Sequence, residues 1–144
     1  MIKIAGLALV AALFCVPSAS AQEGCNIKTL MQRKDIVKAM NDVYGESATT
    51  AYEYGFSVSP HSVVINTSNG QTWIKMPIYT SSIAYFHVHP NAGLNQPSST
   101  DIETLKGLQK QIPGICSYVL GHDRISRTVY EIFPDGHVEM VAHF

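Results

Sequence analysis

Residues 83–101 decide the fold; they read Ile83-Ala-Tyr-Phe-His-Val-His-Pro90, followed by Asn-Ala-Gly-Leu-Asn-Gln-Pro-Ser-Ser-Thr-Asp101. The β-branched and aromatic residues in 83–89 are typical of a short strand, and Pro90 ends it. A helix is predicted over 99–111, because apolar residues recur there at helical spacing and Pro113-Gly114 follows. The residues expected to face the core are Ile102, Leu105, Leu108 and Ile112.

The segments on either side complete an α+β pattern. An amphipathic helix is predicted over 26–44, with Asn26 as its N-cap and Gly45 as its stop. Further strands are predicted over 52–58, 62–66, 72–76, 115–120, 128–133 and 137–142. The turn Pro134-Asp-Gly136 should join the last two strands as a hairpin. We therefore expect one domain over residues 22–144, built as a mixed β-sheet flanked by helices.

The N-terminal segment, residues 1–21, has the composition of a secretory signal peptide. Lys3 precedes an apolar run that ends at Phe14, and the small residues 18–21 follow. A membrane anchor needs roughly 20 apolar residues and no such cleavage site. We expect cleavage before Gln22, no stable membrane insertion afterwards, and a secreted or periplasmic protein.

The charged residues show no basic patch. The chain has 10 basic and 11 acidic residues and a formal net charge of −1. Nucleic-acid binding depends on neutralising phosphates with clustered lysine and arginine. Nucleic acid is therefore not an expected partner, and the oligomeric state is left open.

Cys25 and Cys116 are the cysteines that remain once Cys15 has left with the signal peptide. An exported pair can oxidise, so a Cys25–Cys116 disulfide is favoured over two buried free thiols. In the chain-entropy model, a bridge over so long a loop stabilises the fold by about 4–5 kcal/mol.

His87, His89 and Asp101 form the candidate metal site. Residues i and i+2 of a strand project from the same face, so both imidazoles can aim at one point. Asp101 lies in the first turn of the next helix, which brings its carboxylate back toward the strand end. Two histidines, one carboxylate and an open fourth position describe a catalytic Zn²⁺ site, whereas a structural site uses four protein ligands. As an alternative, Asp101 only complements the helix dipole, with Ser98 as the helix cap.

Glu53 is the candidate general base. Zinc lowers the pKa of a coordinated water to about 7, but a second group must still accept the proton. Glu53 interrupts an otherwise apolar and aromatic predicted strand, a place where carboxylates are rare unless paired or functional. Glu46 is the competitor, and it falls in a polar, turn-like stretch where solvent exposure explains it.

The order Glu53, His87-Val-His89-Pro90, Ser98 and Asp101 resembles the JAMM (JAB/MPN-type) zinc metalloproteases. The resemblance is strongest to a bacterial secreted or toxin-associated JAMM-like group of unassigned function. It implies a JAMM/MPN-like, cytidine-deaminase-like architecture, zinc on His87, His89 and Asp101, catalysis by Glu53, and oxyanion support by Ser98. Two features depart from the common pattern: Val88 replaces Ser or Thr, and the His89–Asp101 spacing is one residue longer.

Two functions remain open at this stage. The first is a secreted metallopeptidase or isopeptidase, whose partner is a peptide or protein substrate from the cell envelope or a rival cell. The alternative is a non-enzymatic JAMM-like interaction or immunity-type periplasmic module. Another zinc hydrolase, such as a phosphoesterase, would need more His and Asp ligands.

The other aromatic and histidine residues are given structural places. Trp73, Tyr79, Tyr85 and Tyr118 are expected in the core, and His61 and His137 at the surface. His122 and, less so, His143 are weak candidates for the site.

Overall fold

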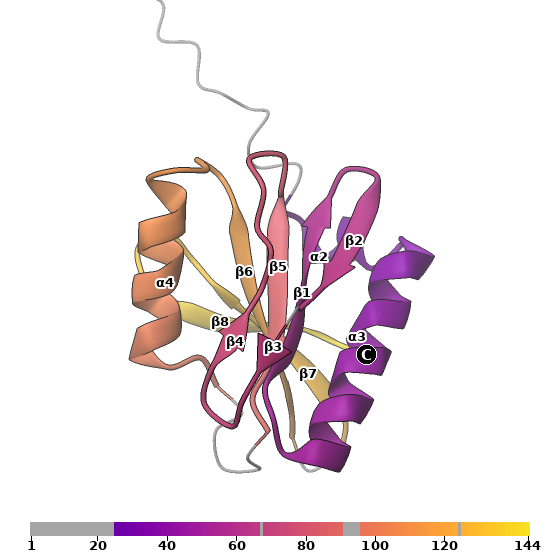
Figure 1. Cartoon of the computed structure of the whole chain (residues 1–144). Coiled ribbons are helices and arrows are strands. Elements are labelled where there is room, and N and C mark those ends of the chain that lie inside the picture. The colour runs from indigo at the N-terminus through magenta and orange to yellow at the C-terminus, as the bar shows by residue number, and fades with distance from the viewer. Residues whose placement is uncertain (1–24, 67, 91–95, 124) are drawn as a thin grey trace, which may run out of the picture.

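The computed structural model describes residues 25–66, 68–90, 96–123 and 125–144 (Figure 1). The predicted signal peptide, residues 1–21, lies outside the described residues. A mixed sheet of six strands runs in the order β2-β1-β5-β6-β7-β8, in which β5 and β6 are parallel and the other neighbours antiparallel. The elements are α2 (Ile27–Leu30), α3 (Lys34–Thr50), β1 (Tyr54–Ser59), β2 (Ser62–Ile65), β3 (Ser68–Asn69), β4 (Ile74–Lys75), β5 (Ala84–Val88), α4 (Ser99–Gln109), β6 (Cys116–His122), β7 (Arg127–Ile132) and β8 (Val138–His143).

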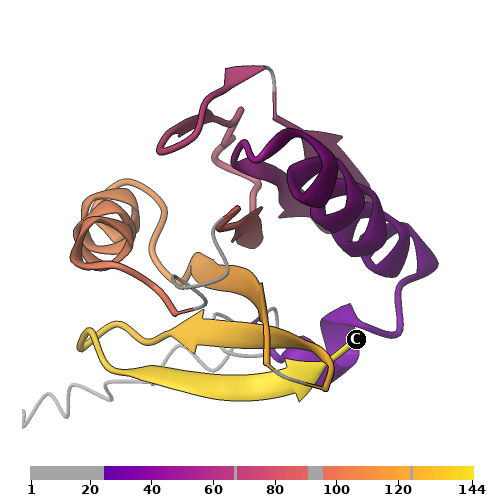
Figure 2. The same cartoon turned by 90° about the horizontal axis from the view of Figure 1, so that it is seen from below.

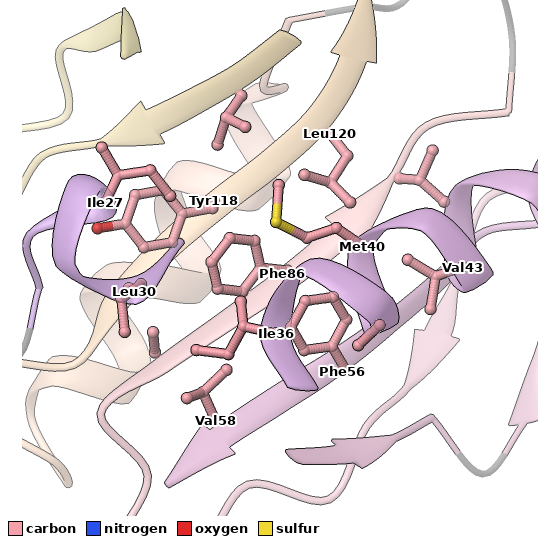
Figure 3. Close-up of a cluster of buried hydrophobic side chains, with 14 residues drawn as sticks. Ile27, Leu30, Ile36, Met40, Val43, Phe56, Val58, Phe86, Tyr118 and Leu120 are labelled. Carbon is pink, nitrogen blue, oxygen red and sulfur yellow. The ribbon is translucent and has the colours of Figure 1, made fainter. Parts of the chain in front are cut away.

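Helices cover both faces of the sheet, which confirms the predicted α+β class. Helices α2 and α3 pack on one face, and α4 lies on the other (Figures 1 and 2). Under α3, the rings of Phe56, Phe86 and Tyr118 stack across three neighbouring strands, with centroids 4.7 and 4.6 Å apart (Figure 3). Among the described residues, none of the helices combines the length and hydropathy needed to cross a membrane.

The N-terminal helix differs from its prediction. Asn26 does cap a helix, because its side chain accepts hydrogen bonds from two backbone N–H groups of α2. The helix then ends, the backbone of Arg33 is extended, and a second helix, α3, begins at Lys34. Gly45 does not end α3, since the cost of about 1 kcal/mol for glycine is offset by burial of the helix face. The helix ends instead at Ala51, which adopts the left-handed conformation with φ of 57°.

The predicted strands agree with the observed ones to within two residues at each end, except around β3 and β4. Only Ile74–Lys75 of the predicted strand 72–76 forms a strand, and it pairs with Ser68–Asn69, for which no strand was predicted. The hairpin of β7 and β8 is confirmed, with Gly136 at φ of 91° in its turn.

The predicted Cys25–Cys116 disulfide is present. The Cα atoms of the two cysteines lie 5.7 Å apart, and the disulfide ties Cys25, just ahead of the N-cap of α2, to the first residue of β6. The Tyr118 hydroxyl donates to the carbonyl of Cys25 and strengthens the same junction. The bridge therefore fastens the N-terminal helices to the centre of the sheet.

Glu131 gives the fold a pH-dependent stability. Burial and the opposing carboxylate of Glu139 on β8 raise its pKa from 4.5 to about 7, and His137 partly offsets this. Between pH 4.5 and 7, the folded state therefore keeps a proton on Glu131 that the unfolded state has lost. The contribution of this proton to the free energy of unfolding is fully present below pH 4.5 and is lost as the pH rises to about 7. The pKa difference corresponds to about 3 kcal/mol at most, and solvent screening of this half-buried group reduces it to about 1 kcal/mol.

Glu131→Gln is accordingly expected to stabilise the protein by about 1 kcal/mol at pH 8 and by almost nothing at pH 4.5. Denaturant unfolding at both pH values measures the difference. Glu46→Gln, on the exposed face of α3, is the control and should change neither value. An equal gain at both pH values would show that Glu131 titrates normally.

Candidate metal centre

The candidate metal centre is built on the central strand β5. His87 lies between Gly55 of β1 and Val119 of β6. Since side chains alternate, His87 shares with Tyr85 the face that α4 covers, while Phe86 and Val88 enter the opposite core. His89 directly follows the end of β5 on the same face as His87, which fits the alternation predicted from the sequence.

The three predicted ligands come together. The Nε2 atoms of His87 and His89 are 3.1 Å apart, and they lie 3.1 and 3.3 Å from the Oδ1 and Oδ2 atoms of Asp101, respectively. A tetrahedral zinc ion with bonds of about 2.0–2.1 Å holds neighbouring ligand atoms about 3.3 Å apart. The side chains of the three residues are only 5%, 8% and 15% exposed. These residues could therefore hold a metal ion.

Asp101 is held in place by the start of α4. Ser98 is the N-cap, and the predicted cap at this position is confirmed as a full capping box. The backbone N–H and the hydroxyl of Ser98 donate to Asp101 Oδ2 at 2.6 and 2.7 Å. Thus the cap that begins the helix also orients the carboxylate, so the capping role shown here is compatible with the ligand role predicted for Asp101.

The electrostatics of the site favour an ionised Asp101. Burial works against its charge, but hydrogen bonds from His87 and His89, the electrostatic attraction of His87 and the hydrogen bond from the Ser98 hydroxyl outweigh burial and lower the pKa of Asp101. The carboxylate is therefore available as an anionic oxygen ligand for a divalent cation.

Glu53 lies beside the same group, although its position in the strand was predicted wrongly. It precedes β1 rather than interrupting it. Tyr54 pairs with Val88, and Glu53, the residue before it, lines the same pocket as His87, His89 and Asp101. Burial raises the pKa of Glu53, and the nearby His87 and His89 partly lower it.

The competitor Glu46 lies on α3, where it is exposed, instead of in a turn. It does not line the pocket described next. The structure therefore brings Glu53, and not Glu46, to the candidate metal ligands.

A pocket of about 560 Å³ is lined by the candidate metal ligands, and Ser98 and Glu53 also line it. Trp73, expected in the core, is 53% exposed and lines this pocket; Tyr79 is equally exposed but lies outside the lining. Tyr85 and Tyr118 are buried as predicted. The remaining described histidines, His61, His122, His137 and His143, belong neither to the metal group nor to the pocket lining.

Sequence reasoning missed Gly55, which the β1–β5 register reveals as a supporting residue. A Cβ atom there would lie 2.3 Å from the Phe86 carbonyl oxygen and 3.0 Å from the His87 Cα atom. Both neighbours are backbone atoms of β5 and cannot move aside separately. Gly55 therefore permits the close strand approach that sets the position of His87.

Gly55→Ala is expected to destabilise the fold by about 2–3 kcal/mol, which is near the upper end of the cost of forcing extra atoms into a packed core. It should also weaken metal binding, because it displaces His87. Denaturant unfolding and a zinc titration measure the two effects. Gly107→Ala is the matched control, because a Cβ there meets nothing within 4 Å and alanine favours a helix. Equal behaviour of both variants would contradict the role given to Gly55.

The chain matches no protein-family model, and no curated protein matches it in sequence. Its function is therefore inferred from the geometry of the candidate metal centre and its pocket.

Proposed function

We propose that the chain is a zinc-dependent metallopeptidase or isopeptidase of the JAMM type. The observation that carries the proposal is the convergence of His87, His89 and Asp101, whose ligand atoms lie within 4.8 Å of one another, with Glu53 in the same pocket. These polar side chains come from three separate segments of the chain. A purely structural role gives no physical reason for gathering them in one pocket.

The donor set supports zinc as the metal. Two imidazoles and one carboxylate are ligands that zinc accepts, and three protein ligands leave one position for water or substrate. When bound, zinc would polarise the amide carbonyl and lower the pKa of a coordinated water. The order of Glu53, His87, His89, Ser98 and Asp101, with a His-x-His strand inside a mixed sheet and Asp101 in the next helix, supports the JAMM resemblance.

Glu53 performs the proton transfers in the proposed reaction. Its carboxylate accepts a proton from the attacking water and later gives that proton to the leaving amide nitrogen. Burial raises the pKa of Glu53, which suits a group that must both accept and donate a proton near neutral pH.

Ser98 acts first as a positioning residue, because its hydroxyl donates to Asp101. Oxyanion support by Ser98, which the JAMM resemblance implies, requires this hydroxyl to turn toward the substrate oxygen.

The disulfide supports an oxidising destination for the protein. Together with the predicted signal peptide, it favours substrates outside the cytoplasm, namely peptides or proteins of the cell envelope or of a rival cell.

The test uses the protein exported from the full chain, loaded with zinc and incubated with peptidoglycan stem peptides and with unfolded proteins. We expect new amino groups to appear, and we expect them to disappear when the zinc is removed by a chelator. Stoichiometric zinc without cleavage of any amide bond near pH 7 would refute the hydrolase and favour the interaction module.

A further inference from the structure

Five apolar side chains line the pocket, and they are called the apolar wall: Trp73, Ile74, Met76, Ile78 and Leu108. The first four residues come from β4 and its flanks, and Leu108 comes from α4. In Figure 1, the β3–β4 pair lies near the end of β5 from which the chain runs on to α4. The apolar wall and the candidate metal ligands therefore line one pocket.

Trp73 is held at the rim of this wall by Gly70. A Cβ atom on Gly70 would lie 2.2 Å from the Trp73 Nε1 atom, so the indole packs against the bare glycine backbone. The N–H of Gly70 donates to the Trp73 carbonyl, and the Gly70 carbonyl accepts from the N–H of Glu53, both at 2.8 Å. The same short hairpin thus positions both the exposed indole and the candidate base.

The charged side chains that line the pocket are Asp101, one of the candidate metal ligands, and Glu53, the candidate base. Among the described lining residues there is no Lys or Arg, and the only carboxylates are Glu53 and Asp101. A charged side chain placed against the apolar wall would lose hydration without gaining a partner. A large apolar side chain would instead bury its surface there.

Tyr85, which is 3% exposed, lines the same pocket. Its hydroxyl is closed off from solvent and lies beside the hydroxyl of Ser117. Tyr85 therefore contributes ring surface to the pocket and not a hydrogen-bonding group. This ring surface adds to the apolar surface that a bound side chain would meet.

We propose that the apolar wall is a specificity subsite that takes a large apolar side chain of the peptide substrate, next to the amide to be cleaved, with Trp73 as the main contact. The inference rests on the proposed function and names its substrate class as peptides with leucine-like or phenylalanine-like residues at this position.

Binding of hydroxamates tests the subsite without requiring turnover. The probes are the hydroxamates of N-acetylated Phe, Leu, Gly, Glu and Lys, titrated by calorimetry into the zinc-loaded Glu53→Gln variant. The Phe and Leu probes should bind about 100-fold tighter than the Gly probe, as expected for a pocket that gains several carbon atoms. The Glu and Lys probes should bind no better than the Gly probe. Equal affinity for all probes, a preference for a charged probe, or no binding of any probe would overturn the subsite.

Trp73→Ala should reduce the preference for the Phe probe over the Gly probe about tenfold and leave the affinity of the Gly probe unchanged. Tyr79→Ala is the matched control, because Tyr79 is also an aromatic side chain that is 53% exposed but lies outside the pocket lining. An unchanged preference in Trp73→Ala, or an equal loss in both variants, would refute the role of Trp73.

Two further readings separate the subsite from the hydrolase. Trp73 is the only tryptophan of the chain, so its fluorescence in the metal-free protein should respond to N-acetyl-phenylalanine amide and not to N-acetyl-glycine amide. This response without any amide hydrolysis would support the subsite while the hydrolase fails. Hydrolysis with no preference for an apolar residue would support the hydrolase and refute the subsite.

Discussion

Glu53→Gln is expected to lower amide hydrolysis by about 10²–10⁴-fold while leaving zinc binding and folding unchanged. The substitution preserves the size of the side chain and its hydrogen-bonding reach. It removes the group proposed to take the proton from water and pass it to the leaving amine. Glu53 precedes β1, and its hydrogen bond to Gly70 is made by the backbone N–H. Because glutamine keeps this N–H, it can occupy the same place.

The measurement is the initial rate on a cleaved peptide, with zinc content and denaturant unfolding recorded for the same sample. Glu46→Gln is the control and should retain the parent rate, because Glu46 is exposed on α3. Parent-level turnover in Glu53→Gln, or an inactive Glu46→Gln, would show that the base is misassigned. Loss of folding in Glu53→Gln would assign Glu53 a structural role.

His87→Ala and Asp101→Asn are each expected to abolish zinc binding at micromolar metal. With zinc at 100 times its dissociation constant, the metal should stabilise the parent by about 2.7 kcal/mol, and both variants should lose this gain. Asp101→Asn is the cleaner change, because an amide oxygen can still accept the hydrogen bonds that Ser98 donates at the start of α4. It removes the anionic ligand and keeps the cap.

Thermal unfolding with and without zinc measures this loss. His61→Ala serves as the control, since His61 is exposed in the turn between β1 and β2 and lies outside the metal group. A zinc-dependent rise in Tm that survives in Asp101→Asn and in His87→Ala would place the metal elsewhere.

The clustering of His87, His89 and Asp101 could be predicted because the placement of each residue follows from a local rule. Strand alternation places His87 and His89 on one face, and the spacing from Ser98 to Asp101 is that of a capping box. These relations hold within a few residues and need no knowledge of tertiary contacts. The disulfide could also be predicted, because only two cysteines remain after the expected cleavage.

Other features depend on contacts between distant segments and escaped prediction. Gly45 looked like a helix stop, but packing of α3 on the sheet carries the helix past it. Gly55 becomes important only through its register opposite His87. Trp73 looked like a core residue, since an aromatic side chain at a pocket rim and one in a core have the same local pattern. Glu53 was identified by its unusual surroundings, yet its position beside His89 emerges only from the β1–β5 pairing.

Zinc content of the purified, exported protein is the most direct test of the metal centre. After loading with zinc and dialysis, native mass spectrometry should find one zinc ion per chain. The His87→Ala/His89→Ala double variant, treated in the same way, should carry none. Stoichiometric zinc in the double variant, or a parent protein that retains no zinc, would contradict the assignment of His87, His89 and Asp101 as its ligands.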